Sequence, residues 1–215
     1  MSTPTTPGTI GPGEFFPVVG VGPHEKPWPQ GPQYDAELLL NGDRRNVLDH
    51  YRYWSVNAIV ADLNTKRHKL HIAIENWQHD LNIGSIVRTA NAFNVSGVHI
   101  VGKRDWNKRG AMVTDRYLSV HHHPTVNDFA NWCGENDLPI IGIDNVPGSE
   151  RLERAQLPER CVLLFGQEGA GMSEEGIAVC ENLYEINQYG STRSMNASAA
   201  GAIAMYHWAL QHLPK

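Results

Sequence analysis

From Leu70 to the C-terminus, short apolar segments alternate with segments of helical periodicity, and this alternation constrains the fold more than any other feature. Short β-branched or aliphatic runs predict strands over 70–74, 98–101, 139–143, 161–165 and 183–186. Helical spacing and capping residues predict helices over 84–93, 125–136, 173–180 and 196–213. Nearly continuous apolar strands separated by helices are typical of a parallel sheet covered on both faces. The sequence therefore predicts an α/β fold, a parallel sheet flanked by helices.

Two segments of different composition precede this region. Eight of the thirteen prolines and six glycines fall within the first 32 residues, a composition too poor in apolar periodicity to repay the entropy of ordering it. Residues 1–42 are therefore predicted to form a flexible arm. Residues 43–69 are predicted to form a basic extension with an amphipathic helix over 46–63, and the domain that carries the sheet then spans 70–215. The helix is predicted from four residues at helical spacing: Val47, Tyr51, Trp54 and Ala58.

The net charge of −5 hides an uneven distribution along the chain. Residues 43–116 hold twelve basic against seven acidic side chains, whereas 1–42 hold one against four and 117–215 hold five against twelve. An acidic average argues against a polyanionic partner, but a basic middle segment keeps nucleic acid open as a partner. An ordinary solvated face explains the same charges equally well.

The composition argues against several classes of protein. No apolar run approaches the roughly 18 residues of a membrane-spanning helix, and no signal peptide is visible, so we expect a cytoplasmic protein without a membrane partner. Three cysteines without a CxxC pair are expected to be buried thiols: Cys133, Cys161 and Cys180. Successive side chains of the run 121–123, all histidines, point to opposite faces of a strand and have no partner at ligand spacing, so no metal site is predicted.

One loop at the predicted carboxyl edge of the sheet is rich in glycine, and ligands of α/β proteins bind at that edge. It follows the strand over 161–165 and reads Gly166-Gln167-Glu168-Gly169-Ala170-Gly171-Met172-Ser173. Glycines allow tight turns and leave backbone groups open to a ligand. The spacing GxxGxG is neither the dinucleotide fingerprint nor a P-loop, so the motif alone is weakly specific. Glu168 is its candidate functional side chain, because a carboxylate at a strand end contacts a ligand or fixes the loop.

Two further loops carry polar side chains beside a helix start. The loop over 187–196 places Ser194 and Asn196 just before the last helix, where simple helix capping explains them as well. Another segment places Asn82 at a helix start and Arg88 two turns later, and alone Arg88 reads as a surface arginine. A serine hydrolase is not predicted because no GxSxG elbow is present, and a dinucleotide-dependent dehydrogenase lacks its GxGxxG.

Taken together, the three loops resemble one family. In order and approximate spacing they are similar to the three motifs of the SpoU/TrmH family of RNA ribose 2'-O-methyltransferases, which belongs to the SPOUT class. The matching residues are Asn82 with Arg88, then Gly166-x-Glu168-Gly169-x-Gly171-Met172-Ser173, then Ser194-Met195-Asn196-Ala197-Ser198. The resemblance covers most of the chain from Leu70 to Leu213. It departs in the third motif, where the family more often has Ser-Leu-Asn-Val-Ser, and both changes keep an apolar residue.

The resemblance implies a sheet whose C-terminal part forms a deep trefoil knot, an obligate homodimer, and S-adenosyl-L-methionine as cofactor. Nothing in the apolar pattern predicts a knot, because knotted chains are rare. The implied cofactor contacts are Gly166, Ile186 and Met195, largely through backbone groups. The implied catalytic residues are Asn82, Arg88, Glu168, Ser194 and Asn196, with the first motif approaching the pocket of the partner subunit. The small residues over 197–202 would pack at the knot and dimer interface, although core packing explains them equally well.

Family resemblance gives Arg88 the role of activating the ribose 2'-hydroxyl. A guanidinium has a pKa above about 12 and is a poor general base. We therefore expect Arg88 to grip the adjacent phosphate and to stabilise developing oxyanion character. Ser194 and Asn196 are expected to orient these groups, and Glu168 to hold the loop or Asn82.

RNA is expected to bind to the basic middle segment of the chain. Five basic residues surround the loop after the strand over 98–101, with Trp106 as a stacking platform: Lys103, Arg104, Lys108, Arg109 and Arg116. Others extend this set on the N-terminal side: Arg44, Arg45, Arg52, Lys66, Arg67 and Lys69. The expected substrate is tRNA or rRNA. The alternative is a catalytically silent RNA-binding or ribosome-assembly protein that keeps the fold.

Overall fold

The computed structural model describes residues 20–77 and 82–214 and divides the chain into two compact units, 1–59 and 60–215. This division falls at Ile59, whereas the sequence predicts boundaries after residues 42 and 69. Each unit is described by itself. The C-terminal unit holds the predicted sheet and all of the predicted site residues.

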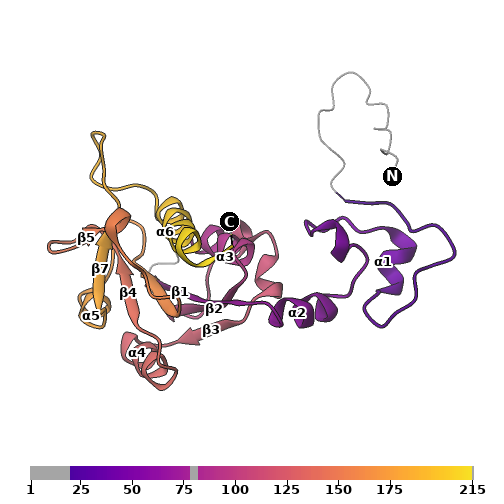
Figure 1. The fold of residues 1–215 in the computed structure, drawn as a ribbon, viewed down its shortest axis with the longest axis horizontal. Helices are drawn as coiled ribbons and strands as arrows, with labels where there is room; N and C mark the ends of the chain where they lie inside the picture. Colours follow the sequence, from indigo (N-terminus) through magenta and orange to yellow (C-terminus); the bar gives the residue numbers. More distant parts are fainter. Residues whose placement is uncertain (1–19, 78–81, 215) are drawn as a thin grey trace. The chain divides into compact units, whose positions relative to one another are not determined.

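A seven-stranded sheet forms the centre of the C-terminal unit (Figure 1). Its strand order is β3-β2-β1-β6-β4-β7-β5, and every pair of neighbours is parallel. The strands are β1 (His68–Asn76), β2 (Val95–Gly102), β3 (Val120–His123), β4 (Ile140–Ile143), β5 (Glu150–Arg151), β6 (Cys161–Phe165) and β7 (Asn182–Glu185). Because all of the strands run the same way, their carboxyl ends meet at one edge of the sheet.

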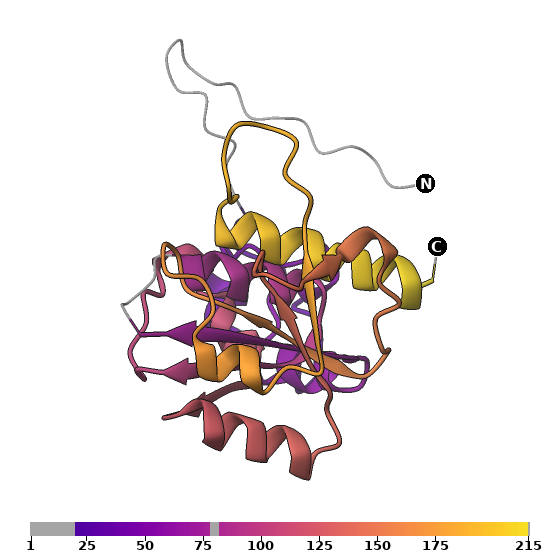
Figure 2. The same ribbon diagram turned by 90° about the vertical axis from the view of Figure 1, so that its left-hand side faces the viewer.

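Helices cover both faces of this sheet (Figures 1 and 2). On one face lie α3 (Asn82–Ala92) and α6 (Ala197–His212), which pack against each other over a core that includes Ile72 and Trp208. The other face carries α4 (Val126–Glu135) and α5 (Glu174–Ala178) over a second core. Short 3-10 helices connect these elements: η2 (Arg109–Ala111), η3 (Thr114–Tyr117) and η4 (Leu152–Arg154). The predicted α/β class, a parallel sheet flanked by helices, is confirmed, while the C-terminal trefoil knot stays a prediction.

The predicted strands and helices of this unit match observed elements, with two strands added. The sequence pattern does not predict β3, since three of its four residues are histidines, nor β5, which has only two residues. Helix ends follow their caps: Thr125 accepts a hydrogen bond from the Asp128 amide at the start of α4, and Ser173 does the same for the Gly176 amide at the start of α5. Figure 2 shows the segment between β7 and α6 as a long loop.

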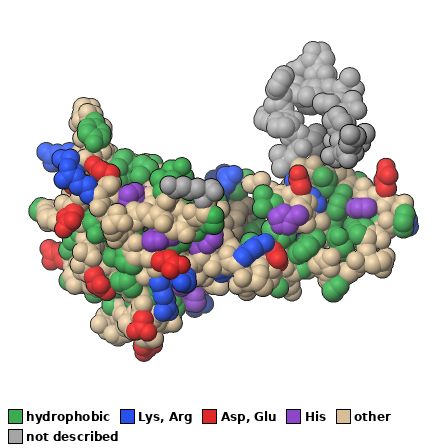
Figure 3. Space-filling model, viewed as in Figure 1, with side chains coloured by type: hydrophobic (Ala, Val, Ile, Leu, Met, Phe, Trp, Pro, Cys, Tyr) green, Lys and Arg blue, Asp and Glu red, His purple; other side chains and the backbone are tan. Residues whose placement is uncertain are grey.

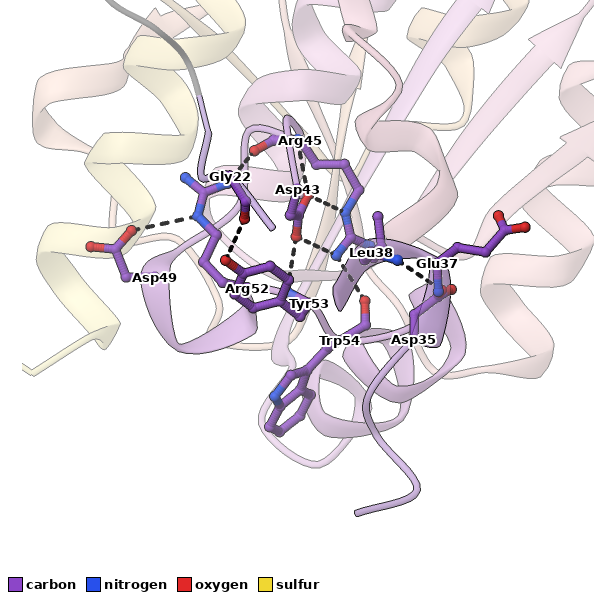
Figure 4. A network of polar contacts seen from close by, with 10 residues as sticks. All are labelled: Gly22, Asp35, Glu37, Leu38, Asp43, Arg45, Asp49, Arg52, Tyr53 and Trp54. Carbon is purple, nitrogen blue, oxygen red and sulfur yellow. Dashed lines mark hydrogen bonds and ion pairs between the residues drawn. The ribbon is translucent and has the colours of Figure 1, made fainter. Parts of the chain in front are cut away.

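The N-terminal unit is organised around a buried carboxylate (Figure 4). Asp43 is fully buried and accepts hydrogen bonds from the Arg45 guanidinium and from the Tyr53 amide, while Arg45 also donates to the Trp54 carbonyl. Burial alone would raise the pKa of Asp43, but the hydrogen bonds and the charge of Arg45 lower it to about 2. The unit also contains α1 (Ala36–Asn41), capped by Asp35, and the 3-10 turn η1 (Asp49–Tyr51).

Two expectations for this part of the chain need correction. The predicted flexible arm, 1–42, is only partly described, and its described part, from Gly20, contains α1 and a bridge between Val21 and Asp43. The helix predicted over 46–63 is wrong in its first half, since α2 spans only Val56–Asn64. The hydrogen bond to Asp43 holds the Tyr53 amide in place, and Tyr53 has φ of 63°, which no α-helix allows.

Candidate active site

A cavity of about 670 Å³ lies at the carboxyl ends of β4, β6 and β7. Its walls come from segments 143–146, 165–172 and 193–197, with Ile186, Gln188 and Ala200. All three residues predicted to contact the cofactor line this cavity: Gly166, Ile186 and Met195. Three of the predicted catalytic residues line it as well, namely Glu168, Ser194 and Asn196.

The glycine-rich loop that follows β6 folds back on itself. The amides of Gln167 and Gly171 each donate to the other residue's carbonyl, at 3.2 and 3.1 Å. A Cβ atom on Gly166 would lie 2.2 Å from the carbonyl carbon of Gly171, so only glycine allows this closure. Gly171 has φ of 71°, in the left-handed region. The shape of this cavity wall therefore depends on glycine at two positions.

The three predicted loops meet through one hydrogen-bonded cluster of Asn82, Glu168 and Asn196. Asn82 Nδ2 donates to Glu168 Oε2 at 2.5 Å, and Asn196 Nδ2 donates to Asn82 Oδ1 at 2.8 Å and to Glu168 Oε1 at 3.3 Å. Asn82 and Asn196 are 114 residues apart in sequence. The expectation that Glu168 holds Asn82 matches this contact.

Asn196 also serves the helix that it precedes. Its Oδ1 accepts hydrogen bonds from the Ser198 amide at 3.0 Å and the Ser198 hydroxyl at 2.5 Å, which caps the start of α6. Capping and membership of the cluster are therefore compatible, because the oxygen of the amide caps the helix while its nitrogen joins the cluster.

Arg88 lies apart from the cavity of its own chain. Among the described residues that line the cavity, neither Arg88 nor Asn82 appears. Asn82 is nonetheless buried and joined to the rim through Glu168, whereas the Arg88 side chain is exposed on α3, six residues further along. The structure thus brings four of the five predicted catalytic residues to one cavity and its rim, and leaves Arg88 outside it.

Sequence reasoning missed Asp144 and Asn145, which follow β4 and line the same cavity. Asp144 Oδ2 accepts from the Met172 amide at 2.7 Å, and Asn145 Nδ2 donates to the Arg193 carbonyl at 2.5 Å. These bonds connect the loop after β4 to the two other loops of the cavity. The available signal was position, since Asp144 is the first residue after a predicted strand, where functional side chains are expected.

The five basic residues predicted to bind RNA are all exposed, on the segment that follows β2: Lys103, Arg104, Lys108, Arg109 and Arg116. Lys108 pairs with Asp115 at 3.1 Å and lies 5.5 Å from the ring centroid of Trp106. On the face drawn in Figure 3, basic side chains lie in small groups with acidic side chains between them. The loop therefore offers scattered cations beside an aromatic ring.

The basic residues of 43–69 contribute less to such a surface than the sequence suggests. Arg45 pairs with Asp43, Lys66 with Asp62 at 2.6 Å, and Lys69 with Glu159 at 3.1 Å. The Arg67 guanidinium donates to the carbonyls of Tyr117 and Val95, which fixes the segment before β3. Only Arg44 of this set is exposed without an ion pair among the described residues.

A row of histidines crosses the sheet away from the cavity, on the face covered by α4. His71 Nδ1 lies 3.0 Å from His99 Nε2, and His99 Nδ1 lies 2.9 Å from His123 Nε2. The His121 ring stacks on the His99 ring. Trp132 also packs against His99, and the centroids of these two rings are 4.4 Å apart. Burial and the neighbouring imidazoles lower the pKa of His99 to about 2, and burial, His121 and Arg160 lower that of His71 to about 4. The row is therefore neutral at pH 7.

Other candidate chemistry is limited. Within residues 20–77 and 82–214, no group of three or more histidine, cysteine or acidic side chains is arranged to hold a metal ion. Cys133 and Cys161 are buried and Cys180 is half-buried, and burial raises the pKa of each thiol to about 12. No helix in the described part of the chain is long and apolar enough to cross a membrane.

Residues 69–206 match the model of the SpoU rRNA Methylase family. A tRNA (guanosine(18)-2'-O)-methyltransferase of Borreliella burgdorferi is 24% identical over 147 residues, which make up 67% of this chain and 67% of that protein.

Solved structures with the same fold include two methyltransferases. The SpoU methyltransferase AviRb from Streptomyces viridochromogenes, in complex with the cofactor AdoMet, aligns with a TM-score of 0.61 at 23% identity and covers 70% of this chain and 60% of that chain. The A. aeolicus TrmH/SpoU tRNA modifying enzyme aligns with a TM-score of 0.64 at 20% identity and covers 73% of this chain and 81% of that chain. The chain thus spans less than two thirds of the AviRb structure.

Proposed function

The chain belongs to the SpoU rRNA Methylase family, and we propose from this premise that it is an S-adenosyl-L-methionine-dependent RNA methyltransferase. It transfers a methyl group to a ribose 2'-hydroxyl of tRNA or rRNA. The observation that carries the proposal is the cavity at the carboxyl ends of β4, β6 and β7, whose rim joins polar residues of three separate loops through Asn82, Glu168 and Asn196.

The cavity fits a nucleoside cofactor in size and in charge. Its volume of about 670 Å³ is in the range of small-molecule sites. The acidic residues Asp144 and Glu168 and the basic residue Arg193 line it, which suits a ligand that carries both positive and negative groups, and the folded-back loop at Gly166 forms part of its wall. When bound, S-adenosyl-L-methionine supplies an electrophilic methyl group on a positively charged sulfur. Gly166, Ile186 and Met195 are the residues that would hold it.

The polar residues of the rim have separate tasks in this proposal. Glu168 holds the Asn82 and Asn196 amides in fixed orientations, so that the ribose hydroxyl can be aligned with the methyl group. Ser194, on the cavity wall, orients the same ribose. Arg88 grips the phosphate next to the reacting ribose with its planar guanidinium and stabilises negative charge on the oxygen as its proton leaves.

A homodimer would bring Arg88 to a cavity. Its side chain is exposed and belongs to no wall of its own cavity, whereas Asn82, six residues earlier, is committed to its own subunit. A stripe of exposed apolar side chains at helical spacing runs along α6, which packs against α3: Ile203, Tyr206 and Leu210. We infer that α6 packs against a second copy of the chain, so that Arg88 reaches the partner's cavity.

RNA would contact the segment after β2 and lie across the rim of the cavity. Arg104 and Arg109 are exposed there, and Trp106 offers a half-buried ring on which a base can stack. Because phosphate contacts release counterions, binding should weaken steeply as salt rises. The alternative function, a silent RNA-binding protein, would need the same segment but not the cluster at the cavity.

Methyl transfer decides between the two functions. The protein is incubated with tritiated S-adenosyl-L-methionine and total RNA from a strain that lacks its gene, and 2'-O-methylated positions are mapped in tRNA and rRNA. The expected result is label at one ribose in the wild-type reaction and its loss in Asn196→Ala. RNA binding without label transfer, by protein that binds the cofactor, would establish the silent alternative.

A further inference from the structure

Glu75 is a fully buried carboxylate that lies outside the cavity and is not one of the predicted site residues. It occupies the carboxyl end of β1, the strand next to β6 in the sheet. Its Oε2 accepts a hydrogen bond from the Ser173 amide at 2.7 Å, and its Oε1 accepts one from the Ser173 hydroxyl at 2.5 Å. Among the described residues no lysine or arginine forms an ion pair with it. A buried carboxylate of this kind needs a structural or functional reason.

The partner of Glu75 is the last residue of the glycine-rich loop. Ser173 ends the loop that begins at Gly166, and its hydroxyl oxygen also accepts from the Gly176 amide at the start of α5. A Cβ atom on Gly176 would lie 2.9 Å from Glu75 Oε1, so glycine there makes room for the carboxylate. Both carboxylate oxygens are therefore occupied by hydrogen bonds from Ser173.

Hydrogen bonds to both strands that neighbour β6 thus hold the glycine-rich loop. In the sheet β6 lies between β1 and β4, and each neighbour supplies one carboxylate at its carboxyl end. Asp144, after β4, accepts from the Met172 amide, and Glu75, on β1, accepts from the next amide, that of Ser173. The two bonds fix the part of the loop that closes back against Gly166. Loop position then depends on Glu75, although its carboxylate does not line the cavity.

We propose that Glu75 is a positioning residue for cofactor binding, which acts through Ser173 to hold the glycine-rich loop in the shape that lines the cavity. This inference rests on the proposed function. A loop held in its binding conformation before the cofactor arrives loses less entropy when the cofactor binds. Loss of the Glu75 contact therefore weakens cofactor binding and leaves the chemical step largely intact once the cofactor is bound.

The neighbouring residue provides a matched comparison. Asn76 is as buried as Glu75, but its Nδ2 donates to the carbonyls of Lys103 and Asp105, at 2.7 and 2.9 Å, in the loop after β2. Adjacent side chains of one strand end therefore hold two different loops. If a substitution only damaged the end of the strand, variants at Asn76 and at Glu75 would weaken cofactor binding alike. The proposal requires that only a change at Glu75 weakens cofactor binding.

Isothermal titration with S-adenosyl-L-methionine tests the proposal in the full-length protein. Glu75→Gln is expected to raise the Kd about tenfold. Ser173→Ala removes the hydroxyl bond but keeps the amide bond to Glu75, so it should raise the Kd about fivefold. The double variant should bind no more weakly than Glu75→Gln, because the hydroxyl bond is already lost there. At saturating cofactor kcat should stay within about threefold of wild type, so that the change appears in the KM for the cofactor. Should Glu75→Gln fail to fold, Ser173→Ala carries the test.

Two control variants separate positioning from stability. Thr125→Ala removes the corresponding helix cap at the start of α4, and Asn76→Ala removes the neighbouring buried contact. Both should lower the melting temperature yet keep the cofactor Kd within about twofold of wild type. If Ser173→Ala binds the cofactor as tightly as Thr125→Ala does, the proposal is overturned while the function stands. If wild-type protein does not bind S-adenosyl-L-methionine, the proposed function itself fails and this inference with it.

Discussion

Acidification from pH 7 to pH 5 should destabilise the C-terminal unit through its row of buried histidines. The pKa of His99 is lowered from 6.5 to about 2 and that of His71 from 6.5 to about 4, in both cases first by burial. The pKa values of His121 and His123 are lowered as well, with Asp128 acting in the opposite direction on His123. Between pH 7 and pH 5, His71 and His99 stay neutral in the folded chain while the same residues take up protons in the unfolded chain, so stability is present above pH 6.5 and is lost as the pH falls.

The magnitude follows from the difference in bound protons. An imidazole that titrates at its ordinary pKa in the unfolded chain, but remains neutral in the folded chain, costs about 2 kcal/mol of unfolding free energy between pH 7 and pH 5. His71 and His99 together therefore lower it by about 4 kcal/mol, a large share of the 5–15 kcal/mol typical of a domain. The carboxylate of Asp43, whose pKa is about 2, remains ionised over this range.

Urea unfolding at pH 7, 6 and 5, followed by tryptophan fluorescence, measures this loss. At an m-value of about 2 kcal/mol/M, the midpoint should fall by about 2 M. His71→Gln should reduce the loss of unfolding free energy between pH 7 and pH 5 by about 2 kcal/mol, which is the contribution of one imidazole. Asn136→Ala is the control, because it removes a hydrogen bond to the Trp132 carbonyl without removing a titratable group, and it should shift the midpoint equally at all three pH values. A midpoint that does not move between pH 7 and pH 5 in wild-type protein would refute the reasoning.

Four further outcomes test the proposed site. Glu168→Ala should lower kcat/KM about 10- to 100-fold in steady-state kinetics, since two site asparagines lose their acceptor. Arg88→Lys should lower turnover at least about tenfold with RNA affinity unchanged, because a lysine cannot make the bidentate contact, and normal turnover would contradict the assigned role. Charge reversal of the Lys108-Arg109 pair should weaken tRNA binding and reduce the slope of log Kd against log salt by about 2, as filter binding at several salt concentrations can show. Tyr206→Glu should give monomers in light scattering, whereas Tyr189→Glu, on an exposed loop, should not alter the mass.

The fold class was predictable because its main strands contain continuous or nearly continuous apolar runs. The runs that became β1 and β6 contain residues with almost no exposed surface, so the local sequence already reflects burial on both faces. Strands with few apolar residues could not be predicted in this way. In β3, burial lowers the pKa of His121 and His123, and both rings pack against Trp132, a contact that exists only after the sheet and α4 have come together.

In the N-terminal unit, the local pattern instead predicts helix where none forms. Apolar residues recur at helical spacing from Val47, but the buried carboxylate of Asp43, ten residues before Tyr53, decides the backbone there. Asp43 binds the amide of Tyr53 and pairs with Arg45, and the helix starts only at Val56. A tertiary hydrogen bond to a buried charge outweighs the small free-energy preference of a few residues for helix.

By itself the sequence determined the α/β class, the order of three polar loops and the residue types that each contributes. These features could be predicted because buried strands and turns each require particular residue types within a short segment. Only the tertiary structure decided that Asn82, Glu168 and Asn196 share hydrogen bonds across as many as 114 residues of sequence. It also decided that Arg88 lies outside that cluster and that Glu75 and Asp144 hold the glycine-rich loop. The physical reason is that parallel strands bring their carboxyl ends to one edge, and which ends become neighbours depends on strand order, which no local pattern encodes.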